Sequence, residues 1–534
     1  MDGRWLGLAL VLAGCPQQPG TDEGCKDSCG CVDADCTDID TDTVDACPDD
    51  PGPRPAPAGA GVADDDADGD GTPDCDDACP DDPGKAAPGA CGCGVPDDDT
   101  DGDGALDCVD NCVAAANPDQ GDGDADLVGD ACDNCVDVVN PDQGDVDGDG
   151  VGDICACASQ PLDCVDGAAG PYACDRADLL ATVPLSTFGA GNANDVWGWA
   201  DPVTGREFAL LGLDVGLGFV DVTNPYCPLV VGLMPTETVG SLWRDVETYQ
   251  HYAYVGSEAA GHGVQVFDLD RLVAAEDAGG LPVQFAPDNV YTSLGNSHTI
   301  TIDTTDGILS ANGSNTCGAG LHLIDLADPL NPVFLGCYDR GGYVHDAQCV
   351  AYTGPDPDHA GARLCVTGNA FAGIVDMVDV TDATDPRRIA DLTYDGAVVA
   401  HQGWLTEDQR YFVFGDEYDE PLTGTTTLTH VFDFTDLDNP VYIGAFDHGT
   451  PNIDHQIYVL GDYAYQSNYT RGLEVVDLTG VATADLQVVA WFDTYPSTDD
   501  PVFEGTWANY PYLPSGTIPV SGIEDGLFLV KVRW

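Results

Sequence analysis

Four histidines occupy the same position in four successive repeats of this sequence, and imidazole is a common ligand for transition metals. His298, His345, His401 and His455 each open a run in which apolar and polar residues alternate. They follow one another at intervals of roughly 50 residues, a spacing typical of repeat architectures. Such regular placement predicts that the four imidazoles meet in the folded chain, where they would suit zinc or another transition metal. The alternative is a structural role, in which each histidine hydrogen-bonds between neighbouring repeats.

Three carboxylates are candidates to join the imidazoles as further ligands or as supporting partners. Glu258, Asp416 and Glu417 each follow the second run of a repeat. The start of strand one and the end of strand two lie at the same end of an antiparallel pair, so these groups should lie near the histidines. The open side of the cluster, where a substrate or anion could enter, is expected to be faced by Asp195, Arg244 and Trp507.

Aspartates at alternate positions form a second set of candidate ligands, in the first third of the chain. The pattern D-x-D-x-D-G-x-x-D occurs three times, and a fourth copy has Leu127 in place of the turn glycine. Carboxylates at i, i+2 and i+4 converge on one hard cation, and the glycine permits the sharp turn between them. The alternative is a solvated acidic linker. The predicted calcium ligands are Asp66, Asp68, Asp70, Asp74, Asp99, Asp101, Asp103, Asp107, Asp122, Asp124, Asp126, Asp130, Asp145, Asp147, Asp149 and Asp153.

The elements that must position the histidines are short strands. Runs such as IYVL, YAYQSN and LEVVDL after His455 alternate with a period of two and are separated by turn residues. Similar sets of runs follow the other three histidines, and further sets begin at Asn194 and Trp243. Four short strands per repeat are the signature of propeller blades. We therefore predict an all-β fold, a seven-bladed β-propeller, preceded by an irregular, disulfide-rich segment that binds calcium.

The last blade lacks a fourth strand in its own part of the sequence. The apolar run Leu179–Leu185 precedes blade one and has no blade of its own. We predict that it pairs with Gly526–Val532 and so closes the ring without an open sheet edge. Within the blades, Cys349 with Cys365 and Cys317 with Cys337 are predicted to be disulfides, because each pair falls at one height on adjacent strands.

The charge and the start of the chain indicate where such a protein would work. Lys and Arg number 16 and Asp and Glu 94, a formal net charge of −78, which repels nucleic acid and anionic membranes and attracts cations. Residues 1–15 end in the sequence Leu-Ala-Gly-Cys and resemble a bacterial lipoprotein signal, with Cys15 as the lipidated residue. The expected location is therefore outside the cytoplasm, as an outer-membrane lipoprotein or at the cell surface. Contact with the membrane is expected only through the lipid anchor. The 23 cysteines are consistent with an oxidising compartment.

Five segments are predicted. They are a signal peptide with lipobox at 1–15, an acidic Cys-rich linker at 16–63, calcium-binding repeats at 64–157, a linker at 158–177 and the propeller at 178–534.

Two resemblances to known families support this division. The runs Asp107–Cys112 (DCVDNC) and Asn117–Gln120 (NPDQ), with a second copy from Asp130, resemble the thrombospondin type 3 repeat. That resemblance implies a chain wound around calcium ions and held by disulfides. WGWADPVTGREFALLG, AHQGWLTEDQRYFVFGDEYDE and YQSNYTRGLEVVDL resemble the choice-of-anchor B family of LVIVD-repeat propellers. This resemblance spans Ala173–Trp534 and implies an exported or surface propeller, without implying a reaction.

Two functions fit these patterns. The first is an exported, surface-anchored calcium-binding protein whose propeller binds an unknown surface or extracellular ligand, as in adhesion. The second is a metal-dependent propeller enzyme, an oxidoreductase or hydrolase, with its site at the histidine-lined mouth. The sequence contains no G-x-S-x-G elbow, phosphate loop or dinucleotide fingerprint, which favours the first.

Overall fold

The structure is a computed structural model that describes residues 66–74, 76–136, 139–141, 143–145, 150–152, 155 and 161–534. It separates into two compact units, Met1–Pro141 and Asp142–Trp534. The predicted signal segment 1–15 with Cys15 and the predicted linker 16–63 lie outside the described residues, as do the candidate calcium ligands Asp147, Asp149 and Asp153.

The described part of the first unit consists of turns and bends. Its residues are mostly Asp, Gly, Pro and Cys, which offer little apolar surface to bury in a core. Disulfides cross-link it instead, and the pairs are Cys79–Cys93, Cys91–Cys108 and Cys112–Cys132. The prediction of a disulfide-rich front segment is confirmed.

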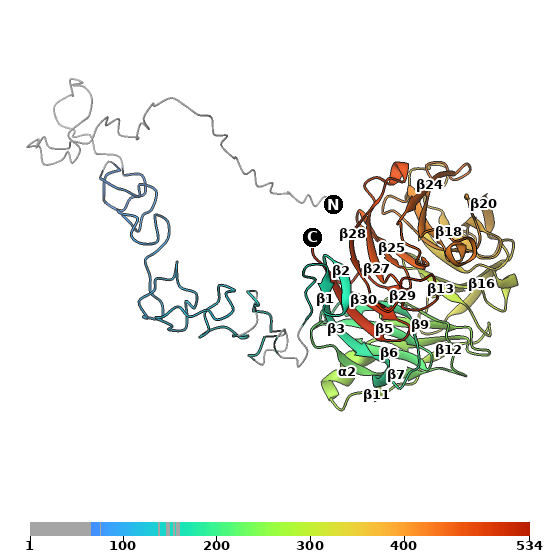
Figure 1. Cartoon of the computed structure of the whole chain (residues 1–534), viewed down its shortest axis with the longest axis horizontal. Coiled ribbons are helices and arrows are strands. Elements are labelled where there is room, and N and C mark those ends of the chain that lie inside the picture. Colours follow the sequence, from blue (N-terminus) through green and yellow to red (C-terminus); the bar gives the residue numbers. More distant parts are fainter. Residues whose placement is uncertain are drawn as a thin grey trace, which may run out of the picture. The chain divides into compact units, whose positions relative to one another are not determined.

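Within residues 161–534 the second unit is a seven-bladed β-propeller, as predicted (Figure 1). Each blade is an antiparallel sheet, and the innermost strands of neighbouring blades contact one another around the centre. The first three blades are β4 (Ala193–Ala200), β5 (Glu207–Leu213), β6 (Gly216–Asp221) and β7 (Leu229–Pro235); β8 (Arg244–Tyr249), β9 (Tyr252–Ser257), β10 (Val264–Asp268) and β12 (Asn289–Tyr291); and β13 (Thr299–Asp303), β14 (Ile308–Asn312), β15 (Leu321–Asp325) and β16 (Val333–Tyr338).

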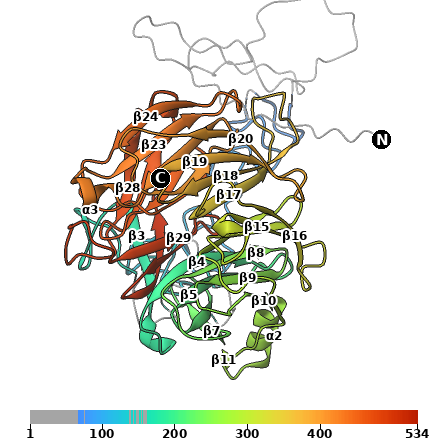
Figure 2. The same ribbon diagram turned by 90° about the vertical axis from the view of Figure 1, so that its right-hand side faces the viewer.

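The remaining blades continue in sequence order, and Figure 2 shows the strands of blade four side by side. They are β17 (Asp346–Ala351), β18 (Arg363–Asn369), β19 (Ile374–Asp379) and β20 (Arg387–Leu392); β21 (Ala400–Leu405), β22 (Tyr411–Asp416), β23 (Leu428–Asp433) and β24 (Val441–Asp447); β25 (Gln456–Leu460), β26 (Tyr463–Ser467), β27 (Leu473–Asp477) and β28 (Gln487–Phe492); and β29 (Thr506–Asn509), β30 (Ile518–Gly522) and β31 (Gly526–Val532) with β3 (Ala177–Pro184).

The ring closes through β3, which pairs antiparallel with β31. The register runs from Ala177 opposite Val532 to Pro184 opposite Gly526, so the strand from the start of the propeller completes the last blade. The predicted closure is confirmed. The sheet would otherwise end in an unpaired edge that could recruit another chain.

Short additional strands extend the sheets of two blades. β1 (Ala168–Ala169) and β2 (Tyr172–Asp175) extend the sixth blade, where β2 pairs with β28. Both strands lie within residues 158–177, which the sequence predicts to be a linker. In blade two, α2 (Asp270–Ala278) interrupts the chain before β12, and β11 (Val283–Gln284) adds in parallel to β7. Single helical turns are η1 (Leu185–Thr187), η2 (Cys317–Ala319) and η3 (Val481–Thr483), and α3 (Asp419–Thr423) follows β22.

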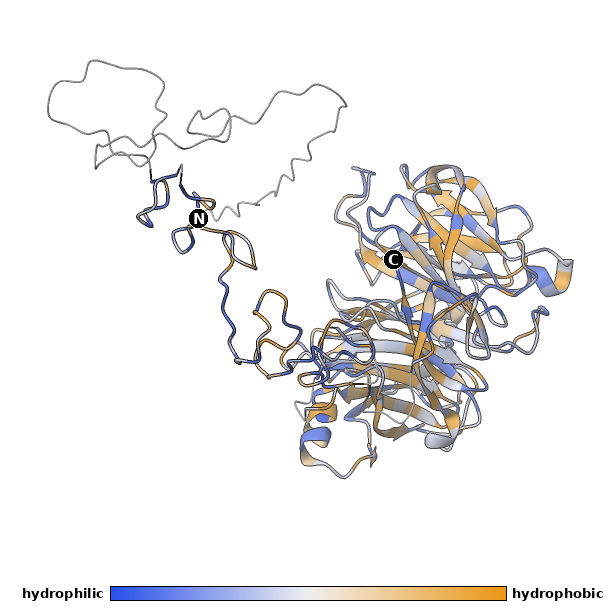
Figure 3. Ribbon diagram, turned by 60° about the vertical axis from the view of Figure 1, so that its left-hand side comes forward, coloured by the Kyte–Doolittle hydropathy of each residue, from blue (hydrophilic) through white to orange (hydrophobic). Residues whose placement is uncertain are grey.

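Hydrophobic residues are concentrated on the strands of the blades (Figure 3). Their buried side chains form clusters between neighbouring blades. Between blades one and two, for example, the rings of Phe219 and Phe267 stack with centroids 4.6 Å apart. Burying each such side chain contributes about 1.5–3 kcal/mol. The two predicted disulfides, Cys317–Cys337 and Cys349–Cys365, are both formed. None of the helices in the described part of the chain is long and apolar enough to cross a membrane.

Candidate functional site

The four repeated histidines lie side by side at one end of the central channel. They occupy the starts of the innermost strands of blades three to six, which are consecutive in the ring. Ring centroids are 4.1 Å apart for His298 and His345, 4.2 Å for His345 and His401, and 4.5 Å for His401 and His455. The structure therefore brings the predicted imidazoles into one continuous arc.

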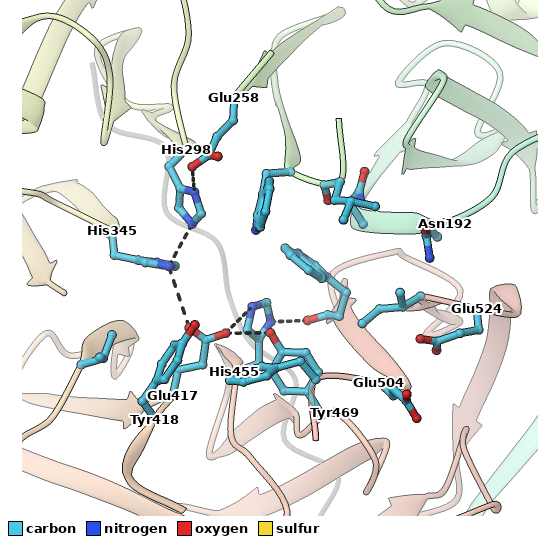
Figure 4. A pocket seen from close by; sticks show the side chains of 18 of the residues that line it. Asn192, Glu258, His298, His345, Glu417, Tyr418, His455, Tyr469, Glu504 and Glu524 are labelled. Atoms are coloured by element: carbon cyan, nitrogen blue, oxygen red, sulfur yellow. Dashed lines mark hydrogen bonds and ion pairs between the residues drawn. The ribbon is translucent and has the colours of Figure 1, made fainter. Parts of the chain in front are cut away.

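A cavity of about 600 Å³ opens directly over this arc (Figure 4). His298, His345 and His455 line it together with Glu258 and Glu417. His401 lies below, where all four histidines line a narrow channel of about 20 Å³. A molecule that enters the cavity thus meets imidazoles and carboxylates on its floor.

Hydrogen bonds fix the tautomer of three of the four imidazoles. His298 Nδ1 lies 2.7 Å from Glu258 Oε1, and His401 Nδ1 lies 3.0 Å from the carbonyl oxygen of His455. His455 Nδ1 bonds the carbonyl oxygen of Trp507. Carbonyl and carboxylate oxygens only accept, so each Nδ1 carries a proton, and in the neutral imidazole Nε2 keeps its lone pair. This is the arrangement by which metal-binding histidines are usually oriented.

Glu417 faces the Nε2 atoms of three histidines from the opposite side. One oxygen, Oε2, is 3.7 Å from His401 Nε2 and 4.0 Å from His345 Nε2, and the other, Oε1, is 3.9 Å from His455 Nε2. The hydroxyl of Tyr469 donates to Oε1 at 2.7 Å and holds the carboxylate in place. The nitrogen–oxygen separations are too long for hydrogen bonds, and they leave space for a cation that contacts both partners.

Two buried nitrogens of the arc have no hydrogen-bond partner among the described residues. They are His401 Nε2 and His345 Nδ1. On its other side, His345 Nε2 lies 2.9 Å from His298 Nε2. A buried polar atom without a partner costs about 1–3 kcal/mol, so the arc is incomplete as a purely hydrogen-bonded structure.

Burial keeps the imidazoles in the form that binds metals. Desolvation lowers the pKa of His455 to about 3, and desolvation with the neighbouring histidines lowers the pKa values of His345 and His401 well below the usual range. Desolvation also raises the pKa of Glu417 to about 7. The hydrogen bond from His298 lowers the pKa of Glu258, which is therefore ionised. His345, His401 and His455 are therefore neutral and can act as metal ligands.

Two of the predicted site residues, Asp416 and Arg244, hydrogen-bond to groups other than the four repeated histidines. Both oxygens of Asp416 accept hydrogen bonds from the loop before β21, namely from the Tyr394 hydroxyl and the backbone N–H groups of Val398 and Val399. Arg244 is buried, with its guanidinium bound to His262 Nε2 at 2.9 Å and to the carbonyl of Leu213 at 2.9 Å.

The expectation that Asp195, Arg244 and Trp507 face the open side is thus wrong for Asp195, whereas Arg244 lines the narrow channel below the cavity. Trp507 lines the cavity. Asp195 is buried deeper, where it accepts a hydrogen bond from the backbone of Val246 in the next blade.

Aromatic residues of the rim were not found from the sequence. Tyr343, Phe371, Phe503 and Tyr469 line the cavity with Trp507. Tyr469 lies two residues after the end of β26, and Tyr343 lies two residues before His345. Their closeness in sequence to the predicted strand-end ligands is the signal that could have identified both. The rim offers flat apolar surfaces above a polar floor, a combination common in ligand pockets.

The three described aspartate loops of the first unit share one geometry. The oxygens of Asp66, Asp68 and Asp70 lie within 4.8 Å of one another, and the corresponding aspartates of the loops at 99–103 and 122–126 do the same. In each loop the backbone N–H of the sixth residue donates to the first aspartate, at 3.1–3.2 Å. One oxygen of each middle aspartate is buried without a hydrogen-bond partner in the part of the chain described: Asp68, Asp101 and Asp124. Three carboxylates in each loop are thus gathered without a counter-ion, which suits a hard cation.

Leu127 adopts the backbone conformation that glycine has in the other loops. Its φ is 80°, against 97° at Gly71 and 102° at Gly104. A left-handed conformation costs a residue with a Cβ about 1–2 kcal/mol. The third loop therefore has the ligand geometry of the other two at a higher cost in backbone strain.

Comparison with known proteins adds one structural similarity. The chain is similar to the β-propeller domain of Cps50 (Swd1) from Myceliophteria thermophila, with 12% sequence identity and a TM-score of 0.43. The similarity covers 67% of this chain and 100% of that one. No protein-family model and no curated protein matches the sequence. The propeller assignment rests on the strand pairing above, and neither the choice-of-anchor B resemblance nor the thrombospondin type 3 resemblance is confirmed.

Proposed function

We propose that the propeller is a binding module built around a transition metal ion at the mouth of its channel. His298, His401 and His455 would hold the ion through Nε2, with His345 and Glu417 as further ligands and Glu258 orienting His298. Imidazoles with one carboxylate suit zinc or a similar ion. When bound, the ion supplies a Lewis-acidic point on the cavity floor, to which a donor atom of an extracellular ligand could attach.

The single observation that carries this proposal is the shared orientation of three imidazoles. Three Nδ1–H groups donate to carboxylate or backbone carbonyl oxygens, and the Nε2 lone pairs of His401 and His455 meet one carboxylate. Histidines that only stabilised the blades would have no need to leave His401 Nε2 buried without a hydrogen-bond partner among the described residues.

A metal-dependent enzyme is the second candidate, and the position of the cavity favours it. His298, His345, Glu417 and His455 line the 600 Å³ cavity, so a substrate of moderate size would reach the ion directly. A hydrolase or oxidoreductase would fit this access.

The metal content of the full chain tests both candidates. We expect protein purified without chelators to hold a stoichiometric transition metal, and zinc or copper added to metal-free protein to raise its Tm. The reason is that an ion bound only by the folded state stabilises that state by mass action. A chain that holds no such metal and whose Tm does not respond to any added ion would contradict the proposal.

The second part of the proposal concerns the first unit and the location. We infer that the aspartate loops bind calcium and that the chain is exported and held at a bacterial surface through a lipid at Cys15. The geometry of the three described loops supports the calcium sites, and the Leu-Ala-Gly-Cys sequence supports the anchor. The propeller would then be a surface binding or adhesion module carried on a calcium-binding segment, in keeping with both family resemblances.

Leu127→Gly tests the calcium loops. Removing the strained side chain should relieve about 1 kcal/mol and tighten calcium binding at the third loop by about fivefold. Leu127 is 83% exposed, so the change removes almost no packing. Calcium titration calorimetry of the full chain measures the effect. Val109→Gly, a change at another exposed apolar residue, is the matched control and should leave the affinities unchanged. Equal affinities in Leu127→Gly and in the original chain would count against calcium at this loop.

A further inference from the structure

Three carboxylates lie buried together on the sixth-blade side of the connection after β22, apart from the histidine arc. Asp419 and Glu420 are the first two residues of α3, and Asp454 immediately precedes His455. Their exposed fractions are 4%, 2% and 1%. None of them is used by the mouth or by the aspartate loops, and charged groups are rarely buried this deeply without partners.

Most of their oxygens are unbonded. Five buried oxygens have no hydrogen-bond partner among the residues that the structure describes: Asp419 Oδ1 and both carboxylate oxygens of Glu420 and of Asp454. No Lys, Arg or His within residues 161–534 forms an ion pair with any of the three. An uncompensated buried carboxylate costs several kcal/mol, so three in contact require a counter-charge.

The backbone makes room for this cluster. A Cβ at Gly415, inside β22, would lie 1.8 Å from Asp454 Oδ2. Glycine in the interior of a strand weakens the strand, and it commonly marks a place where another group approaches closely. At this position the absence of a side chain is what admits the Asp454 carboxylate.

We propose that Asp419, Glu420 and Asp454 form a buried site for a hard divalent cation of the calcium class. Carboxylate oxygens are the ligands that such ions prefer, and calcium takes six to eight of them. The five unbonded oxygens supply most of that number, and backbone carbonyls or water would complete it. This site is independent of the mouth metal, because its ligands are all oxygens and it shares no ligand with the histidine arc.

The alternative counter-charge is a shared proton. Burial and the adjacent charges of Asp454 and Asp419 raise the pKa of Glu420, so a protonated carboxyl could bond to a neighbouring carboxylate. Two shared protons would join at most four of the five unbonded oxygens, whereas one cation can contact them all. The cation therefore accounts for more of the geometry.

The position of the site gives it a structural consequence. α3 begins two residues after Glu417, and Asp454 is bonded covalently to His455. A cation here would fasten together the two segments that deliver Glu417 and His455 to the cavity. It would thus hold the mouth in shape whether or not the mouth itself binds a metal.

Terbium luminescence can detect this site separately from the aspartate loops. Terbium substitutes for calcium and emits strongly when a nearby Tyr or Trp is excited. Residues 16–171 contain no Phe, Tyr or Trp, so ions in the aspartate loops have no aromatic neighbour in their own sequence. Around the proposed site, Tyr418 directly precedes Asp419, and the Tyr469 hydroxyl bonds Glu417. We expect sensitised emission from the full chain that calcium displaces.

Glu420→Gln should reduce this sensitised emission at least tenfold. Glu524→Gln makes the same change at a carboxylate that lines the mouth cavity, and it should keep the emission. Unchanged emission in Glu420→Gln would place the ion elsewhere and overturn the proposal.

Two measurements keep the test decisive if the variant folds poorly. The first uses the original chain alone: folded protein without any sensitised emission overturns the proposal. The second follows unfolding by Trp fluorescence, which reports the propeller. Calcium should raise that Tm in the original chain and in Glu524→Gln, but not in Glu420→Gln. A Tm that calcium does not change, and that rises as the pH falls, would instead show that shared protons neutralise the three carboxylates.

Discussion

Replacing His401 and His455 together by alanine is expected to weaken transition-metal binding by the propeller at least 100-fold. Both residues point an Nε2 lone pair at Glu417, and His401 also bonds the backbone of His455. Loss of an outer partner alone typically costs 10–100-fold in metal affinity, so loss of two direct ligands should exceed that range. Metal content after dialysis and a competition titration against a coloured chelator measure the loss.

The matched control for this experiment removes two imidazoles outside the mouth. His251→Ala with His359→Ala should retain the metal, and near-ultraviolet circular dichroism should show that every variant is folded. If the His401 and His455 pair unfolds the chain, His455→Gln alone should still weaken binding while keeping a polar group of similar size. Full metal retention by the folded double variant would show that these histidines only connect the blades.

Deleting Asp178–Pro184 should prevent the propeller from folding to a soluble monomer. β31 would lose its antiparallel partner, and the buried side chains of Leu179, Leu180 and Val183 would be lost from the core. Three such side chains contribute about 5 kcal/mol or more, comparable with the whole stability of many domains. The exposed edge of β31 should then recruit other chains. Sedimentation velocity and thermal melting would show aggregates and the loss of the cooperative transition.

Two point substitutions in β3 distinguish the contribution of its buried side chains from the contribution of its backbone pairing with β31. Leu180→Asp buries a charge between blades and should lower the Tm strongly, whereas Thr182→Asp changes an exposed residue and should have little effect. A soluble deletion variant with an unchanged Tm would contradict the role of β3 in closing the ring.

The architecture could be predicted because it depends on patterns that the sequence displays directly. Period-two runs define the strands, and the unpaired edge of the last blade called for a strand that only Leu179–Leu185 could supply. The histidines could be placed at one mouth because the start of an innermost strand has the same location in every blade. Their hydrogen bonds could not, since the acceptors for His401 and His455 are backbone carbonyls of the neighbouring blade.

Side-chain direction explains the predictions that failed or stayed unresolved. Asp416 and Glu417 are consecutive, and neighbouring side chains at a strand end point to opposite sides, so only Glu417 faces the histidines. Arg244 is directed to His262, which lies on another strand region of the same blade. His448 lies in the loop after β24 and is nevertheless buried, with its Nδ1 2.8 Å from Glu474 Oε2. In each case tertiary packing determines the side chain's bonding partner, and hydrophobic periodicity in the sequence does not predict that partner.

The pairing of β3 with β31 also sets an order of events during folding. When the chain emerges from its N-terminal end, β3 appears before any complete blade, and β31 is the last strand of the described chain to appear, roughly 350 residues later. Blades one to five each use strands that are near neighbours in sequence, so they can assemble as the chain emerges. β3 must wait, with its apolar face unsatisfied, until the final strand arrives. A chain released before Gly526 would keep both ends of the circle open, and such unfinished chains are natural targets for chaperones and proteases.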